Sequence, residues 1–204
     1  MARSKDDIRS VVSGAGLITD VFTKLTKEVT KQGGSLEDMH RLSTDAGEET
    51  IVEIAKLIVQ APGQVVHVTV DYTDSLEGMI AAGRYDWKNN DINAKNFPIQ
   101  GAGNIAVSTI LVHFNRYIST ADALAELDKL GLRPATLPEL LAVGAKETKL
   151  QKQFPIIALG SVWQSPHGDR CVPCLGYDGS ERELGLSRIG HGWIDVCRFL
   201  AVRK

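Results

Sequence analysis

The chain has 204 residues, of which 43% are hydrophobic and 24% charged, and its formal net charge at pH 7 is −2. This balance is that of an ordinary globular protein and gives no electrostatic reason to expect a nucleic-acid partner. No apolar run approaches the ~18 residues of a transmembrane helix, and the N-terminus, MARSKDDIRS, lacks the apolar centre of a signal peptide. We therefore expect no membrane insertion and synthesis in the cytoplasm, and we leave association with a virion open.

The N-terminal part of the chain, residues 1–62, is predicted to be helical. Apolar residues recur at helical spacing over residues 6–31, although the stretch SGAGL (13–17) interrupts the pattern. A second helix is predicted to start near Ser35, to break at STDAGEE and to resume as TIVEIAKLIVQ. We expect these helices to serve for self-association or for attachment to a particle.

After this segment the signal changes from helix to strand. The stretch QVVHVTVDY (64–72) alternates and is rich in β-branched residues, and IAVSTILVHFN (105–115) is a second strongly β stretch. Between them, SLEGMIAAGRYDW (75–87) predicts a short helix that leads into a long loop.

Two compact helices come next. STADALAELDKLG (119–131) runs from a Ser/Thr cap to a glycine, and ATLPELLAVGA (135–145) opens with Thr136 and Glu139 at the spacing of a capping box. From residue 156 onward the sequence has almost no helical pattern and is rich in glycine, aromatic residues and turns. We therefore predict strands and loops for the C-terminal tail.

All three cysteines fall in this tail, and they raise the question of a metal or redox site. Cys171, Cys174, His191 and Cys197 could supply four tetrahedral zinc ligands or a reactive thiol pair. The first pair has good C-x-x-C spacing, but the second has five residues between ligands. A glycine-rich stretch, not a helix, follows the C-x-x-C motif, which is unlike a thioredoxin-type site. A zinc- or thiol-dependent metalloprotein or oxidoreductase is the alternative interpretation.

Other chemistries have weaker signals. Ser161 lacks the second glycine of a nucleophile elbow, and the five histidines form no HExxH motif. The carboxylates that could gather around a structural calcium ion are Asp169, Asp178, Glu181, Glu183 and Asp195. Solvated loop charges are the favoured interpretation of these residues. We therefore expect no catalytic residues, no cofactor and no enzymatic activity.

Two stretches resemble known proteins. Residues 121–146 are similar to the two-helix segment of C-type lectin folds of the formylglycine-generating-enzyme type, in which an R-x-x-T-x-x-E pattern opens the second helix. Arg133, Thr136 and Glu139 occupy these positions. The chain end, ALGSVWQ…VPCL…ELGLSRIGHGW…CRFLAVRK, resembles the variable region of diversity-generating retroelement proteins.

This resemblance implies a fold class and a domain organisation. The expected class is α+β: a C-type lectin fold at residues 63–204, with two helices packed on a small antiparallel sheet. The helical segment 1–62 precedes it. The implied function is non-catalytic ligand binding, with a variable region at about residues 163–204 and a variable ligand that is expected to be a protein.

The resemblance also implies how the sequence varies. In such proteins a reverse transcriptase copies a template repeat with errors at adenines, so asparagine codons can become Cys, Gly, Ser, Asp, His, Tyr or Arg codons. They cannot become Trp, Gln, Glu, Lys or Met codons. Between residues 165 and 197 only Glu181, Glu183 and Trp193 fall outside the reachable set. The stretch VPCL looks like VPYL with an altered tyrosine codon, which makes Cys174 a sampled side chain.

Alternation along strands divides this region into frame and face, because successive side chains point to opposite sides. The predicted apolar frame is Val162, Trp163, Val172, Leu175, Leu184, Leu186, Trp193, Phe199, Leu200 and Val202. The predicted exposed, ligand-binding set is Ser165, His167, Asp169, Cys171, Cys174, Gly176, Tyr177, Gly185, Ser187, Arg188, Gly190, His191, Asp195 and Cys197. Tyr177, Arg188 and His191 are the expected anchors, since aromatic and Arg side chains dominate binding hot spots.

Overall fold

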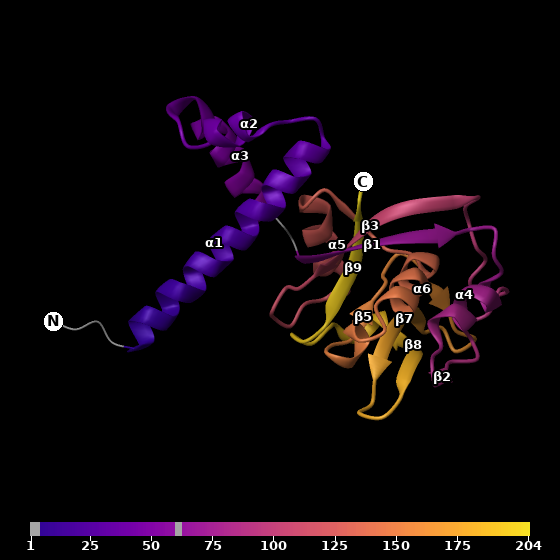
Figure 1. Cartoon of the computed structure of the whole chain (residues 1–204). Helices are drawn as coiled ribbons and strands as arrows, with labels where there is room; N and C mark the ends of the chain where they lie inside the picture. The colour runs from indigo at the N-terminus through magenta and orange to yellow at the C-terminus, as the bar shows by residue number, and fades with distance from the viewer. Residues whose placement is uncertain (1–4, 60–62) are drawn as a thin grey trace. The chain divides into compact units, whose positions relative to one another are not determined.

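The computed structural model describes residues 5–59 and 63–204 of the chain. Its contacts divide the chain into two compact units, Met1–Gln60 and Ala61–Lys204, which Figure 1 shows in indigo to purple and in magenta to yellow. The boundary predicted from the sequence, at residue 62, is close to the boundary between these units, at Gln60. Each unit is described by itself below.

In the N-terminal unit, the described residues form helices joined by short turns. Its elements are α1 (Lys5–Lys31), α2 (Leu36–Arg41), a short 3-10 turn (Asp45–Gly47) and α3 (Glu48–Val59). The expected break at residues 13–17 is wrong, since α1 continues through both glycines. Ser35 caps α2: its backbone N–H donates to the Asp38 carboxylate over 2.8 Å, in a capping box. No helix in the described part of the chain has both the length and the hydropathy needed to cross a membrane.

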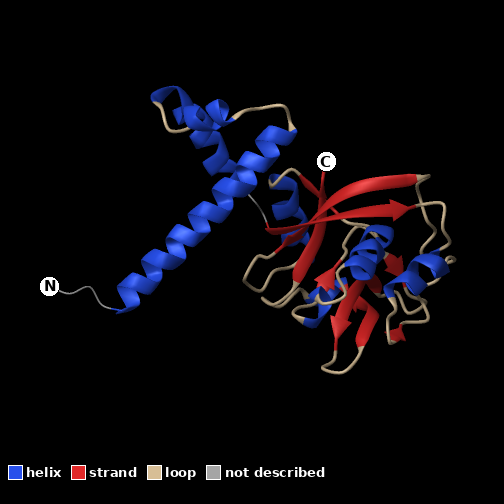
Figure 2. Ribbon diagram, viewed as in Figure 1, coloured by secondary structure: helices blue, strands red, loops and turns tan. Residues whose placement is uncertain are grey.

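The C-terminal unit is built on one large mixed sheet (Figure 2). The strands are β1 (Gly63–Asp71), β2 (Trp87–Lys88), β3 (Asn104–Val112), β4 (Leu132–Pro134), β5 (Ile156–Ile157), β6 (Trp163–Gln164), β7 (Arg170–Tyr177), β8 (Arg182–Arg188) and β9 (Arg198–Arg203). The main path is β1-β3-β9-β5-β7-β8-β2, while β4 pairs with β9 and β6 with β7. The strands predicted at residues 64–72 and 105–115 are confirmed as β1 and β3.

The sheet is larger than predicted and is not purely antiparallel. Within the described residues it has nine strands, and two of its pairings, β5 with β9 and β2 with β8, are parallel. The two-residue strand β5 explains the difference. It pairs with β9 on one side and with β7 on the other, so it joins two antiparallel groups into one sheet. A strand this short leaves no alternation for a sequence pattern to detect.

Helices cover both faces of this sheet. The helices are α4 (Leu76–Gly83), α5 (Thr120–Lys129) and α6 (Leu137–Lys146). Leu140 of α6 and Leu200 of β9 belong to one buried cluster, whereas Leu127 of α5 and Phe199 of β9 belong to another. Because Phe199 and Leu200 are adjacent in a strand, they point to opposite faces. The fold is therefore mixed α and β, with α4 and α6 on one face and α5 on the other.

An ion pair between a buried carboxylate and a half-exposed arginine fixes the start of α6. The Glu139 carboxylate, 1% exposed, accepts hydrogen bonds from both terminal nitrogens of Arg133, over 2.6 and 3.0 Å. It also accepts the backbone N–H of Thr136 over 2.7 Å, which completes the predicted capping box. The R-x-x-T-x-x-E pattern thus ties β4 to the first turn of α6.

A second buried charge links α4, α6 and β8. Arg182 is 7% exposed and donates to the carbonyl oxygens of Gly83 and Gly144, over 2.6 and 2.8 Å. These two residues lie near the C-terminal ends of α4 and α6, where helix dipoles favour positive charge. Arg182 also donates to Oε1 of Gln151 over 2.9 Å. Arg182 was predicted neither as a buried residue of the apolar frame nor as a ligand-binding residue.

Candidate ligand-binding site

The hairpin of β7 and β8 divides the C-terminal residues between the two faces of the sheet. Val172 and Cys174 pack with the cluster that contains α5, whereas Leu175 and Leu184 pack with the cluster that contains α6. Partners in register share a face, so Ser187, opposite Val172, is also on the α5 side. Two adjoining grooves open on this α5 side of the sheet.

The first, which we name the α5 groove, has a volume of about 640 Å³. It is bounded by the start of α5, the loop before β7 and the end of β8. The predicted site residues that line it are Asp169, Arg188, Gly190 and His191. Nη2 of Arg188 lies 3.2 Å from Oδ2 of Asp169, so a charged pair crosses one wall. Leu124 and Val162, both partly exposed to solvent, also line the groove, which therefore combines charged and apolar surface.

The second, which we name the β5 groove, has a volume of about 450 Å³ and lies over β5, β7 and β8. The predicted site residues that line it are Cys174, Gly176, Ser187, Arg188, His191 and Cys197. Sγ of Cys174 lies 3.2 Å from Oγ of Ser187, across the hairpin. Arg188 and His191 line both grooves, so the two grooves adjoin and share these residues as a common wall.

Residues 189–193, which lie where the two grooves meet, are hydrogen-bonded to residues 117–120 at the start of α5. The Thr120 hydroxyl donates to the carbonyl of Ile189 over 2.7 Å and accepts from Nε1 of Trp193 over 2.9 Å. Ile118 and Trp193 exchange two backbone hydrogen bonds, and the Tyr117 hydroxyl donates to the carbonyl of His191. These bonds fix the backbone on which the exposed His191 side chain stands, which lowers the ordering cost of binding.

The glycines of the predicted set have room for side chains. A Cβ placed on Gly190 would meet no atom within 4 Å, and one on Gly176 or Gly185 would make only ordinary contacts, at 3.7 and 3.4 Å. None of the three has a positive φ. Gly192, which is outside the set, has φ of 71° and a Cβ there would lie 2.3 Å from the Tyr117 hydroxyl. Larger residues therefore fit at the predicted variable glycines but not at Gly192.

Some predicted site residues lie outside both grooves. They are Ser165, His167, Cys171, Tyr177, Gly185 and Asp195. Tyr177 is opposite Arg182 in register, on the α6 side, and its hydroxyl donates to the carbonyl of Gly179 over 2.6 Å. The Lys152 ammonium lies 5.1 Å from the centre of its ring. Arg188 and His191 line both grooves and Tyr177 lines neither, so the grooves do not bring the three expected anchors together.

Burial corrects three further expectations. Cys171 and Cys197, predicted to be exposed, are 7% and 6% exposed. Cys197 packs in the α5-side cluster, and Cys171 pairs with β6 on one side and β8 on the other. Val162, predicted in the frame, is 44% exposed because β6 begins one residue later. The frame residues Val172, Leu175, Leu184, Trp193, Phe199, Leu200 and Val202 are buried, as predicted, and Trp163 and Leu186 are half-buried.

The cysteines do not form a common cluster. Cys171 and Cys174 are three residues apart in β7, so their side chains point to opposite faces of the sheet. Within residues 5–59 and 63–204, no three His, Cys, Asp or Glu side chains converge in a way that could hold a metal ion. Burial raises the pKa of each of the three thiols. The geometry thus gives the alternative metal and thiol interpretation no support.

The carboxylate of Asp178, considered above for calcium, forms the hairpin turn instead. Its Oδ1 accepts the backbone N–H groups of Ser180 and Glu181 over 2.8 and 2.7 Å. The hydrogen bond from Glu181 is the largest cause that lowers the pKa of this carboxyl. Asp178 therefore satisfies backbone donors in the turn between β7 and β8.

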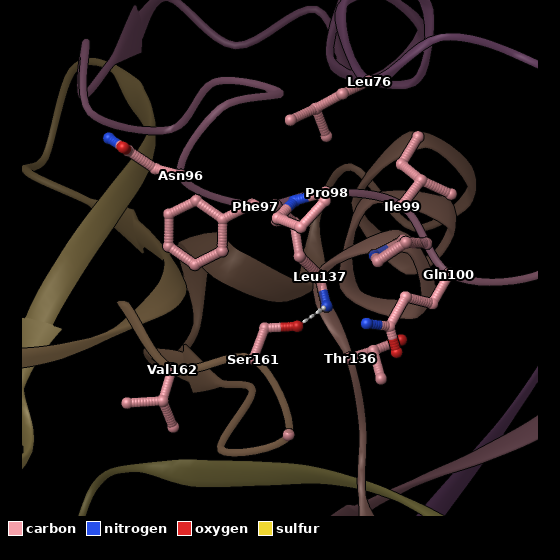
Figure 3. A pocket seen from close by; sticks show the side chains of 12 residues that line it. Leu76, Asn96, Phe97, Pro98, Ile99, Gln100, Thr136, Leu137, Ser161 and Val162 are labelled. Carbon is pink, nitrogen blue, oxygen red and sulfur yellow. Dashed lines mark hydrogen bonds between the residues drawn. The ribbon is translucent and has the colours of Figure 1, made fainter. Parts of the chain in front are cut away.

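A separate cavity of about 240 Å³ lies at the start of α6 (Figure 3). Its walls include Phe97, Gln100 and Ser161, and none of the residues lining it is ionisable. The Ser161 hydroxyl accepts the backbone N–H of Leu137 over 2.8 Å, so this serine caps the helix. No residue of the predicted binding set lines this cavity.

Three residues of the α5 groove were not predicted from the sequence. They are Thr120 and Leu124 of α5 and Ile189, which follows β8. One signal existed: Leu124 is an apolar residue beside the buried core position Ala123, where a polar residue is expected on an exposed helix face. That Thr120 and Ile189 meet follows only from tertiary contact.

Comparison with known proteins adds no relative. The chain matches no family model, and neither a curated protein nor a solved structure matches it significantly.

Proposed function

We propose that this protein is a non-catalytic ligand-binding protein whose C-terminal face varies through adenine-directed retroelement mutagenesis. The observation that carries the proposal is the surface made up of the adjoining α5 and β5 grooves. Eight of the predicted binding residues line it, and most are wholly or partly exposed on a frame of buried apolar residues. A rigid frame under exchangeable side chains is the arrangement that a diversified binding face needs.

A C-type lectin fold is part of this proposal. Three features support it: the bonded set of Arg133, Thr136 and Glu139, the positions of α5 and α6 on opposite faces, and the proximity of the first and last strands. β1 and β9 both pair with β3, so the two ends of the unit meet in the sheet. The resemblance of residues 121–146 to that fold rests on the same residues.

The space around the variable positions supports diversification. Gly176, Gly185 and Gly190 can accept side chains, and the half-buried Ser187 and Cys174 both line the β5 groove. In contrast, Gly192 cannot accept a side chain, and Arg182 bonds both helix ends. A mutagenic process that alters the first group and spares the second would leave the fold intact.

A protein surface is the ligand class that suits the grooves best. They are open, shallow depressions that mix the Arg188–Asp169 pair with apolar side chains such as Leu124. Protein-binding faces combine a few large anchors with small adaptable residues, as antibody paratopes do. Arg188 and His191, which border both grooves, are the proposed anchors.

The decisive experiment is sequencing of the DNA that flanks the gene. The proposal expects a near-copy of the codons for residues 163–204 beside a reverse transcriptase gene, with differences concentrated at adenines of the copy. Variable codons should map to groove positions such as Cys174 and His191, while the codons for Arg182 and Gly192 should be constant. If the flanking DNA holds no such copy, or if the differences ignore adenines, the proposal fails.

A further inference from the structure

One face of α1 carries apolar side chains that its own unit does not cover. Ile18 is 70% exposed, and Val21 and Phe22 are each 53% exposed. Leu25 and Val29, further along the helix, line a cavity of about 460 Å³ together with residues of α2 and α3. Among the α1 side chains whose burial is described, those in the C-terminal turns are therefore the ones that face α2 and α3.

The lengths of the helices explain why the rest of α1 is uncovered. α1 has 27 residues and α3 has 12, which correspond to about 40 Å and about 18 Å of helix. A helix of 12 residues cannot cover a stripe that runs the length of α1. Among the residues whose burial is described, 16 and 18–54, Met39 is the only buried large apolar side chain of this unit.

The apolar residues of α1 follow a heptad repeat. In order, the repeat positions are Ile8, Val11, Ala15, Ile18, Phe22, Leu25 and Val29. The spacing alternates strictly between three and four residues for about three heptads, which is the pattern of a coiled-coil seam. A seam with this period fits another helix of the same period, and an identical helix meets that requirement in full.

The composition of α1 shows that it needs such a partner. Gly14 and Gly16 lie near its middle, and the remainder is rich in Val, Ile and Thr. Glycine and β-branched residues are weak helix formers, so intrinsic propensity alone does not sustain this helix in water. Packing against another surface must supply the missing stabilisation.

Charge allows the partner to be a copy of the same helix. α1 contains five basic and four acidic residues, so two copies have almost no net charge to repel each other. Glu28, which flanks the seam directly before Val29, is paired with Lys31 within the same helix over 3.4 Å. The stripe itself is uncharged and is therefore complementary to itself.

We propose that α1 associates with α1 of a second copy of this chain through the heptad positions before Leu25, with Ile18 and Phe22 in the contact. The association does not rest on the ligand-binding function, because the grooves belong to the other unit. Its consequence is that the protein exists as an assembly of identical chains, held together by the N-terminal unit.

The test is the molar mass of the full-length protein in solution, measured by sedimentation equilibrium from about 1 to about 100 μM. We expect a whole-number multiple of the chain mass that falls toward one chain on dilution. Helical circular dichroism should fall along with it, because packing sustains α1. Phe22→Asp should raise the dissociation constant at least about 100-fold, since it places a charge in the apolar seam.

Two variants control for a general effect of substitution. Thr23→Asp adds the same charge at the next residue, outside the heptad positions, and should leave the mass unchanged. Phe22→Leu keeps an apolar side chain in the seam and should retain the assembly. A wild-type protein that stays at the mass of one chain over the whole range overturns the proposal. Equal weakening by Phe22→Asp and Thr23→Asp would also overturn it.

Discussion

The two units of the chain differ sharply in how well they bury their apolar side chains. In residues 61–204, two clusters fill both faces of the sheet, and residues such as Leu140 and Leu184 are completely buried. In residues 1–60, Ile18 and Phe22 are exposed although they lie on an amphipathic helix. The C-terminal unit therefore gains most of the hydrophobic stabilisation available to the chain. An amphipathic pattern specifies a helix, but it does not specify that the covering surface lies in the same chain.

The largest effect should come from removing the buried Glu139 carboxylate of the C-terminal unit. Glu139→Ala removes the capping box and the acceptor of the Thr136 N–H and of Arg133, and should lower the free energy of unfolding by about 2 to 5 kcal/mol. Chemical denaturation measures it. The matched control is Glu126→Ala, which removes an exposed pair with Lys129 and should cost at most about 1 kcal/mol. Equal losses for both variants would show that the buried carboxylate has no special role.

Core truncations compare the two units directly. Leu140→Ala opens a cavity in the C-terminal core and should lower the free energy of its unfolding by about 2 to 5 kcal/mol. Met39→Ala truncates the buried methionine of the other unit and should leave this main transition unchanged. The measurement is thermal unfolding followed by near-ultraviolet circular dichroism, to which the aromatic residues of the C-terminal unit contribute. A main transition lowered by Met39→Ala would mean that the units unfold together.

Two glycine-to-serine substitutions compare a position that cannot accept a side chain, Gly192, with a predicted variable position, Gly190. Gly192→Ser forces a side chain into a positive-φ position against Tyr117 and should cost about 1 to 3 kcal/mol. Gly190→Ser enters open space and should change the free energy of unfolding by less than about 0.5 kcal/mol. Both are measured by urea denaturation. A similar cost at the two positions would contradict the assignment of Gly190 to an exchangeable face.

The smallest expected effect is a pH dependence from the buried thiols. Burial raises the pKa of Cys197 above its usual value of 9.0, since the folded protein favours the neutral thiol. The resulting stabilisation is fully present below the ordinary thiol pKa and is lost as pH rises through the higher folded value. The free energy of unfolding should therefore decline less above pH 9.0 in Cys197→Ala than in the wild type. Identical pH profiles for the two proteins would show that this thiol does not contribute.

Local signals in the sequence determined most of the elements. Alternation over residues 64–72 and 105–115 gave β1 and β3, and the capping residues Thr136 and Glu139 gave the start of α6. These signals act over a few residues, so they survive in the linear sequence. The same alternation correctly identified buried frame residues such as Val172 and Leu175, because a paired strand fixes which face each side chain occupies.

Tertiary structure decided what depends on contacts between distant residues. β5 is too short to show a period, so its parallel pairing with β9 follows only from its position between β9 and β7. Tyr177 lines neither groove because the register places it at the turn end of the hairpin, opposite Arg182, whereas Arg188 is at the other end, opposite Cys171. The sequence by itself determined the longer strands, the helix caps and most of the core positions. The fold determined which residues meet in the grooves, because those neighbours come together only when separate elements pack.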